Sequence, residues 1–159
     1  MTSHTATVEW RRGSQPFLDN KYSRAHVWTF DGGATVEASS SPHVVRVPLS
    51  EPANVDPEEA YVAALSSCHM LWFLSIAAGR GFCVDSYRDE AFGHLARNGT
   101  GKQWLSRVQL RPRIVFSGPT IPDPAQVQHL HHRAHCECFL ANSVRTEVIV
   151  CPAPVHSEP

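Results

Sequence analysis

The chain has 159 residues, a length typical of one domain, and 42% of them are hydrophobic, which is enough to build a core. Its formal net charge of -1 argues against binding to nucleic acid or to an anionic membrane surface. Residues 1–13 contain no apolar run typical of a signal peptide, so we expect a cytoplasmic protein. In that reducing compartment the five cysteines are expected to be reactive, metal-binding or incidental thiols.

The N-terminal segment, residues 1–55, is predicted to form strands and a loop. Residues 5–10 alternate between polar and apolar side chains, and residues 23–30 and 34–39 read as two further strands. An Asp-Gly-Gly turn between the second and third strands is a hairpin signal. A proline-containing loop then leads into the central helix.

A long apolar helix is predicted over residues 56–81. Asp56 can cap it, Pro57 suits the first helical position, and Glu59 completes a capping-box pattern. From residue 60 to residue 78 almost every side chain is apolar, on all sides of the helix. A helix that is apolar all round is expected to be buried all round.

The apolar run is close to the length of a membrane span, which needs about 20 residues. Serines and His69 interrupt it, and acidic residues precede it, so a core helix is the favoured interpretation. A chain this short has few residues to cover every face of such a helix. We therefore predict an obligate homodimer with the central helices near the interface.

Residues 82–151 are predicted to form strands, a helix and a last strand. We expect long strands over 82–96 and 103–116, the second with an edge or bulge at Pro112. A second helix follows over 124–137, then a short turn and a strand over 145–150. The tail 152–159 is expected to be frayed. This order predicts one α+β domain over residues 1–159 and not a doubly wound nucleotide-binding fold.

The segment 129–138 contains four histidines and two cysteines. On a helix His131, His135 and Cys138 share one face, while His129, His132 and Cys136 share another. Two ring nitrogens and a thiolate on one face make a plausible zinc or iron site. A solvated histidine-rich face is the alternative.

The cysteines also permit redox chemistry. A thiol that attacks a peroxide must be a thiolate, and the resulting sulfenic acid can condense with a second thiol. Cys68, within the buried central helix, and Cys138, at the end of the second helix, would suit these two roles. Cys136 lies two residues away and could compete, whereas Cys83 and Cys151 are expected to be incidental. The alternative for Cys68 is a small core residue.

Several motifs resemble those of the OsmC/Ohr family, the osmotically inducible and organic hydroperoxide resistance proteins. DPEEAYVAALSSCHM resembles the helix that carries the family's first cysteine, and CFLANSVRTEV resembles its second cysteine segment. SRAHVWTFDGGATVEASSSPH resembles the N-terminal strands. The chain departs from the family pattern in the second cysteine segment. It has CFLA there, whereas the peroxidases often have CP.

The resemblance implies a role for four residues. Cys68 matches the peroxidatic cysteine and Cys138 the resolving cysteine, because the second motif fits only when it begins at Cys138. Glu58 matches the glutamate that precedes the first cysteine. Arg24 is the best match to the activating arginine, with Arg46 as a rival.

The resemblance also implies an OsmC-like fold, with antiparallel sheets packed around long central helices in an intertwined homodimer. The implied activity is reduction of organic hydroperoxides to alcohols through a Cys68 sulfenic acid and a Cys68–Cys138 disulfide. A lipoyl-type dithiol would recycle the enzyme, with no metal, haem or other cofactor. Trp72 and Phe139 would supply apolar walls for an organic peroxide in the cleft formed by dimerisation. The alternative is a non-catalytic protein that holds a small ligand in the dimer cleft, or a metal at His131, His135 and Cys138.

Overall fold

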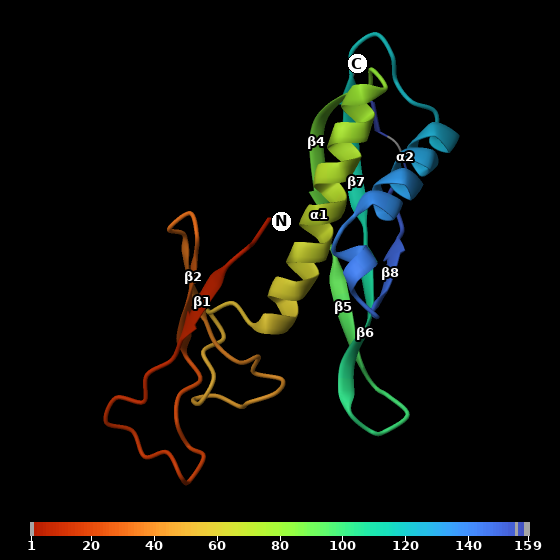
Figure 1. The fold of residues 1–159 in the computed structure, drawn as a ribbon. Helices are drawn as coiled ribbons and strands as arrows, with labels where there is room; N and C mark the ends of the chain where they lie inside the picture. The colour runs from red at the N-terminus through yellow and green to blue at the C-terminus, as the bar shows by residue number, and fades with distance from the viewer. Residues whose placement is uncertain (1, 155, 158–159) are drawn as a thin grey trace. The chain divides into compact units, whose positions relative to one another are not determined.

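The computed structural model describes residues 2–154 and 156–157. The chain divides into two compact units, Met1–Ala60 and Tyr61–Pro159. Figure 1 traces both units from the N-terminus to the C-terminus.

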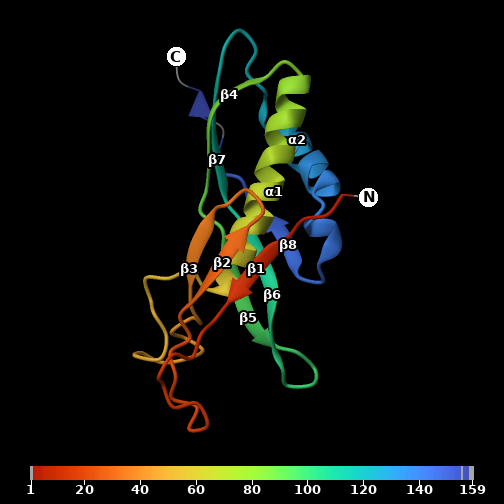
Figure 2. The same cartoon turned by 60° about the vertical axis from the view of Figure 1, so that its left-hand side comes forward.

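The first unit contains one antiparallel sheet, with strands in the order β1-β2-β3. β1 is Ala6–Glu9, β2 is His26–Phe30 and β3 is Thr35–Ala38, and Figure 2 shows the three strands side by side. All three predicted strands are confirmed, each shorter than its pattern. The predicted hairpin turn is also present, with Gly33 at a φ of 85° that favours glycine.

The central helix α1 spans Pro57–Gly79, as predicted. Its capping box is formed: the Glu59 N–H donates to Asp56 Oδ1 at 2.8 Å, and the Asp56 N–H donates to Glu59 Oε1 at 2.9 Å. The helix is long and apolar enough to cross a membrane, although the core helix of a soluble protein meets the same criteria. It is not buried all round in the single chain, because its buried residues form one stripe: Leu65, His69, Phe73 and Ala77.

The second unit contains two further sheets, in the orders β4-β7-β9 and β5-β6-β8. The predicted strand over 82–96 is two strands, β4 (Cys83–Asp89) and β5 (Phe92–Arg97). Its predicted partner is likewise two strands, β6 (Gln103–Leu110) and β7 (Pro112–Ser117). Proline has no N–H to donate and is tolerated at the first position of a strand, which explains why β7 begins at Pro112. The long hairpin is thereby divided between two sheets.

Two C-terminal strands add to these sheets in parallel. β8 (Glu147–Val150) pairs with β6, and β9 (His156–Ser157) pairs with β7. The expectation of a wholly frayed tail is therefore wrong at residues 156–157, while residues 155 and 158–159 lie outside the described residues. The predicted antiparallel sheets are present, and these two strands are parallel additions to them.

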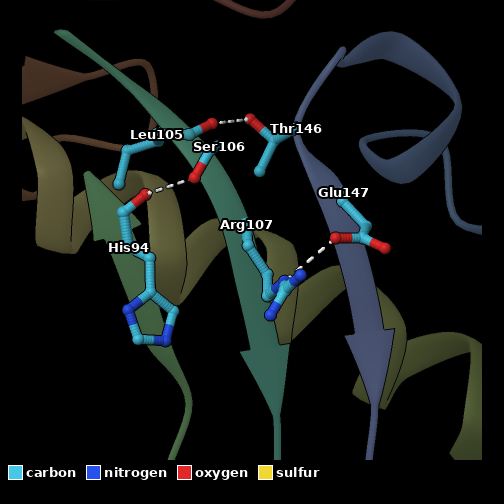
Figure 3. Close-up of polar contacts among 6 residues, drawn as sticks. All are labelled: His94, Leu105, Ser106, Arg107, Thr146 and Glu147. Atoms are coloured by element: carbon cyan, nitrogen blue, oxygen red, sulfur yellow. Dashed lines mark hydrogen bonds and ion pairs between the residues drawn. The ribbon is translucent and has the colours of Figure 1, made fainter. Parts of the chain in front are cut away.

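Side-chain contacts hold β5, β6 and β8 together (Figure 3). The Thr146 hydroxyl donates to the Leu105 carbonyl at 2.7 Å, and Arg107 pairs with Glu147 at 2.9 Å. The Ser106 hydroxyl donates to the His94 carbonyl at 3.2 Å. These contacts fix the C-terminal end of the second cysteine motif, which contains Thr146 and Glu147.

The second helix, α2 (Pro124–Glu137), begins at a capping box formed by Asp123 and Gln126. It ends at Cys138 and is followed by the short 3-10 helix η1 (Ala141–Ser143). One apolar cluster joins α2 to α1 and to β7, through residues that include Leu130, Phe73 and Phe116. The two helices that carry the cysteines therefore pack against a common core.

A glycine sets how closely α1 approaches β5. A Cβ atom at Gly93 would lie 2.8 Å from Val62 Cγ2 and 2.9 Å from Leu105 Cδ2. Contacts this short are essentially never seen, so a larger residue would force the side chains of Val62 and Leu105 to shift. Gly93 thus supports the position of the helix that carries Cys68.

Candidate active site

Two cysteines meet where α1 and the end of α2 come together. The Sγ atoms of Cys68 and Cys138 lie 2.8 Å apart, and the thiol of Cys138 donates the hydrogen bond. Both cysteines are free thiols. Cys138 is only 1% exposed, whereas Cys68 is half-buried. The sequence had predicted that Cys68 would be fully buried within the central helix. The more accessible sulfur is thus the one on the central helix.

The backbone holds Cys138 in this position. Its N–H donates to the Ala134 carbonyl at 3.0 Å at the end of α2, and its carbonyl accepts from the Asn142 N–H at 3.1 Å. The Ala141 N–H donates to the Cys138 sulfur at 3.4 Å. Burial, together with the hydrogen bond to Cys68, raises the pKa of Cys138 to about 11. Cys138 therefore remains a thiol, and a donor, at neutral pH.

An aromatic pair adjoins the two thiols. Trp72 lies one helical turn after Cys68, and Phe139 directly follows Cys138. Their rings meet edge to face, with centroids 5.6 Å apart. Phe139 is 70% exposed, so it presents apolar surface beside the sulfur atoms. This surface suits the apolar part of an organic molecule.

A buried histidine pair links the same two helices. His69 Nε2 lies 3.0 Å from His131 Nδ1, with the two rings nearly parallel. Burial is the main cause that lowers the pKa of His69 to about 4 and that of His131 to about 3. Both rings are therefore neutral at pH 7. The partner of His69 lies 62 residues away along the chain, so no local sequence pattern identifies it.

The histidine-rich segment does not form the metal site considered from the sequence. His131 Nδ1 contacts His69, and Cys138 contacts Cys68. Within residues 2–154 and 156–157, no three His, Cys, Asp or Glu side chains are grouped so that they could hold a metal ion. Cys136 is exposed and contacts His132 at 3.8 Å, so Cys138 is the cysteine that faces Cys68.

Arg24 and Glu58 line one cavity of about 520 Å³ in the first unit. Trp10, Phe17 and Tyr22 also line it, with ring centroids 4.7–5.9 Å apart. The Arg24 guanidinium stacks over the Tyr22 ring at 3.8 Å and donates to Asn20 Oδ1 at 2.8 Å. The lining of this cavity therefore includes three aromatic rings, the Arg24 guanidinium and the Glu58 carboxylate.

Arg46, the other candidate for the activating arginine, does not share the position of Arg24. Arg46 is exposed and does not belong to the lining of the Arg24 cavity. The structure thus brings Cys68 and Cys138 into contact in the second unit, whereas Arg24 and Glu58 share only the lining of one cavity in the first unit. Glu58 and Cys68 both lie on α1, about 15 Å apart along the helix axis.

Comparison with known proteins identifies the family. Residues 50–151 match the family model described as OsmC-like protein. The chain is 57% identical to an OsmC-like protein of unknown function from Vibrio cholerae, with a TM-score of 0.94 over 96% of this chain and 100% of that chain. No curated protein matches the chain.

Two more distant structures share the fold. An organic hydroperoxide resistance protein from Elizabethkingia anophelis is 19% identical, with a TM-score of 0.69 over 99% of this chain and 98% of that chain. The organic hydroperoxide resistance protein OhrB of Bacillus subtilis is 15% identical, with a TM-score of 0.59 over 99% and 98%. The family match covers well over half of the sequence, and the chain therefore belongs to the family of OsmC-like proteins.

Proposed function

We propose that this protein is a thiol-dependent peroxidase that reduces organic hydroperoxides to alcohols in the cytoplasm. The observation that carries the proposal is the 2.8 Å contact between Cys68 Sγ and Cys138 Sγ. Two thiols at this distance can form a disulfide after a small adjustment of their side chains. The names of the Elizabethkingia and Bacillus relatives, organic hydroperoxide resistance proteins, support the same substrate class.

In the first step the Cys68 thiolate attacks the terminal oxygen of the hydroperoxide. The O–O bond breaks, an alkoxide leaves and takes up a proton to become the alcohol, and Cys68 becomes a sulfenic acid. The assignment of Cys68 as the attacking residue rests on its greater exposure and on the hydrogen bond that it accepts. A hydrogen bond donated to a sulfur favours the anionic form of that sulfur.

In the second step Cys138 attacks the Cys68 sulfenic sulfur. Water leaves, and a Cys68–Cys138 disulfide forms. A small dithiol of the lipoyl type then reduces this disulfide by exchange and becomes a cyclic disulfide itself. The net reaction converts one hydroperoxide and one dithiol into an alcohol, water and a disulfide.

Arg24 and Glu58 are assigned supporting roles. We propose that the Arg24 guanidinium stabilises the Cys68 thiolate in the assembled protein and that Glu58 positions this arginine. Their presence in one cavity supports a joint role, and the aromatic walls of that cavity suit an organic peroxide. A positive charge near a thiol favours its reactive thiolate form.

We further propose that the protein works as a homodimer. In the single chain α1 exposes apolar side chains, with Leu71 60% exposed near the middle of the helix. Large exposed apolar residues on a helix of this composition indicate a surface that another protein covers. A second copy of the chain is the simplest partner.

Consumption of cumene hydroperoxide with a lipoyl-type dithiol tests the proposed activity. The wild-type protein is expected to turn over many equivalents, and Cys68→Ser is expected to abolish turnover. Cys83→Ser is the matched control, because Cys83 is an exposed thiol on β4. Wild-type turnover by Cys68→Ser would exclude this mechanism.

A further inference from the structure

A small cavity of about 270 Å³ lies in the second unit, beside the paired strands β4 and β7. These two strands run side by side in Figure 1 and in Figure 2. Three arginines line the cavity, together with a glutamate, a cysteine and an alanine: Arg88, Arg111, Arg113, Glu90, Cys151 and Ala153. All three arginines are exposed, so a dissolved ligand can reach their guanidinium groups. We call this cavity the arginine pocket.

The sheet gathers the three positive charges at one place. Arg88 and Arg113 are directly opposite each other across β4 and β7, and like charges in that position destabilise a sheet. Arg111 directly precedes β7 and lies two residues before Arg113. Residues two apart on an extended chain point to the same face. An anion among these side chains would offset their repulsion.

One carboxylate of the lining compensates one arginine. Arg88 donates to Glu90 Oε1 from Nε at 3.1 Å and from Nη2 at 2.8 Å. Glu90 is the one acidic residue in the described lining. Within residues 2–154 and 156–157, no hydrogen bond or ion pair engages the guanidinium groups of Arg111 or Arg113. The arginine pocket therefore keeps two positive charges without a partner.

A stacking contact orients the guanidinium of Arg111. Its central carbon lies 4.1 Å from the centroid of the Phe92 ring. Stacking uses the flat face of a guanidinium, so its N–H groups, which lie in the plane of the group, are still able to donate. Arg111 is thus held in place while its hydrogen-bond donors remain available to a ligand.

Backbone hydrogen bonds fix the segment that completes the lining. The Cys151 N–H donates to the Leu110 carbonyl at 2.8 Å, and the Ala153 N–H donates to the Pro112 carbonyl at 2.9 Å. Leu110 and Pro112 are the two sequence neighbours of Arg111. The position of Arg111 and that of the Cys151 segment are therefore set together. A preorganised site loses less freedom when a ligand binds.

The charge of the lining favours a phosphate group as the ligand. Arginine forms bidentate hydrogen bonds with both phosphate and carboxylate oxygens. A phosphate monoester carries a charge of about -1.5 to -2 at pH 7 and presents three acceptor oxygens, whereas one carboxylate carries a single charge. Two unpaired guanidinium groups match the phosphate dianion. The small volume and the net charge of -1 on the whole chain argue against an extended polyanion such as nucleic acid.

We propose that the arginine pocket binds a small phosphate dianion, either inorganic phosphate or a phosphate monoester. Arg111 and Arg113 donate hydrogen bonds to its oxygens. The ligand also reduces the repulsion between Arg88 and Arg113. The site uses none of the residues assigned to the peroxidase reaction, and the proposal does not depend on that activity.

Cys151 serves as the reporter for ligand binding. It is an exposed thiol in the lining, whereas Cys83 is an exposed thiol outside the lining. The full-length protein is alkylated with uncharged iodoacetamide at an ionic strength held constant with sodium chloride, and mass spectrometry follows each thiol. We expect saturating inorganic phosphate to slow the alkylation of Cys151 at least tenfold and to leave the rate at Cys83 unchanged. Equal rates at Cys151 with and without phosphate would overturn the proposal.

Two further probes identify the kind of anion. Methyl phosphate is expected to protect Cys151 as inorganic phosphate does, and the one of the two that protects at lower concentration indicates whether the natural ligand is esterified. Succinate carries two charges on separate carboxylates and is expected to protect at least tenfold less well. Stronger protection by succinate than by either phosphate would overturn the assignment of a phosphate ligand.

Two variants locate the site. The double variant Arg111→Gln and Arg113→Gln removes the two unpaired charges and is expected to abolish the protection of Cys151 by phosphate. Arg145→Gln makes the same change at an exposed arginine outside the lining and is expected to behave like the wild type. Circular dichroism checks that both variants fold. Full protection in a folded double variant would show that phosphate acts elsewhere and would overturn the proposal.

Discussion

The thiol of Cys138 donates a hydrogen bond to the sulfur of Cys68 across 2.8 Å, and the two sulfurs differ sharply in exposure. The donor is enclosed and protonated at neutral pH, because burial raises its pKa to about 11. The acceptor is the sulfur that a substrate can reach. This asymmetry gives the two cysteines different expected chemistry.

Removal of the resolving thiol is expected to stop the reaction at its intermediate. In Cys138→Ser the Cys68 sulfenic acid forms but cannot condense, so dimedone is expected to label Cys68 stoichiometrically after one equivalent of cumene hydroperoxide. The wild-type protein is expected to show little labelling, because the disulfide forms first. Mass spectrometry of the tryptic peptides measures both. Labelling at Cys136 and not at Cys68 would contradict this assignment, because Cys136 is an exposed residue of α2 that contacts His132.

Truncation of the aromatic side chain beside the thiols is expected to affect bulky peroxides selectively. Phe139→Ala removes exposed apolar surface next to Cys138, so kcat/KM for cumene hydroperoxide should fall about tenfold, which corresponds to about 1.4 kcal/mol. The value for hydrogen peroxide, which has no apolar part, should change little. Steady-state kinetics with both substrates provide the comparison. An equal loss for both peroxides would indicate damage to the thiol pair and not to substrate binding.

The buried histidine pair predicts a loss of stability in mild acid. His69 and His131 have folded-state pKa values of about 4 and about 3, below the value of 6.5 for an ordinary histidine. Below pH 6.5 the unfolded chain therefore binds protons that the folded chain does not, and the free energy of unfolding falls as pH decreases. The maximum slope is about 1.4 kcal/mol per pH unit for each histidine.

Urea unfolding at pH 7, 6 and 5 measures this slope. The double variant His69→Phe and His131→Phe should lose most of the pH dependence in that range. His132→Ala removes an exposed histidine of the same helix and serves as the control. A double variant with the wild-type slope would show that other groups cause the acid sensitivity.

A charge on the exposed face of α1 is expected to separate the proposed dimer. Leu71→Glu would place a carboxylate in an apolar interface, where an unpaired charge costs several kcal/mol. Sedimentation velocity at micromolar concentration should show a dimer for the wild type and a monomer for the variant. Lys102→Glu changes an exposed residue between β5 and β6 and should leave the mass unchanged. A monomeric wild-type protein would remove the homodimer from the account.

Local signals predicted some elements well. Asp56 with Glu59 marks the start of α1 because a capping box depends on residues three positions apart, and Pro124 occupies the first position of α2, which suits proline. The division of the long hairpin and the parallel additions of β8 and β9 depend on contacts between distant segments. No local pattern encodes those contacts.

The candidate active site was likewise predicted only in part from the sequence. The resemblance of the two cysteine motifs led to Cys68 and Cys138, and the structure brings these residues into contact. The bond between His69 and His131 escaped sequence analysis because residues on different helices meet only after packing. The solvent-facing position of Cys136 likewise follows from the rotation of α2 about its axis, which its weak apolar pattern left open.

Peptide mapping after oxidation tests the central claim most directly. The wild-type protein is treated with one equivalent of cumene hydroperoxide, alkylated and digested without a reductant. We predict a mass loss of about two hydrogen atoms per chain and one crosslinked peptide that joins Cys68 to Cys138 within the same chain. A protein in which both residues remain alkylated thiols, or in which the crosslink joins other cysteines, would contradict the account.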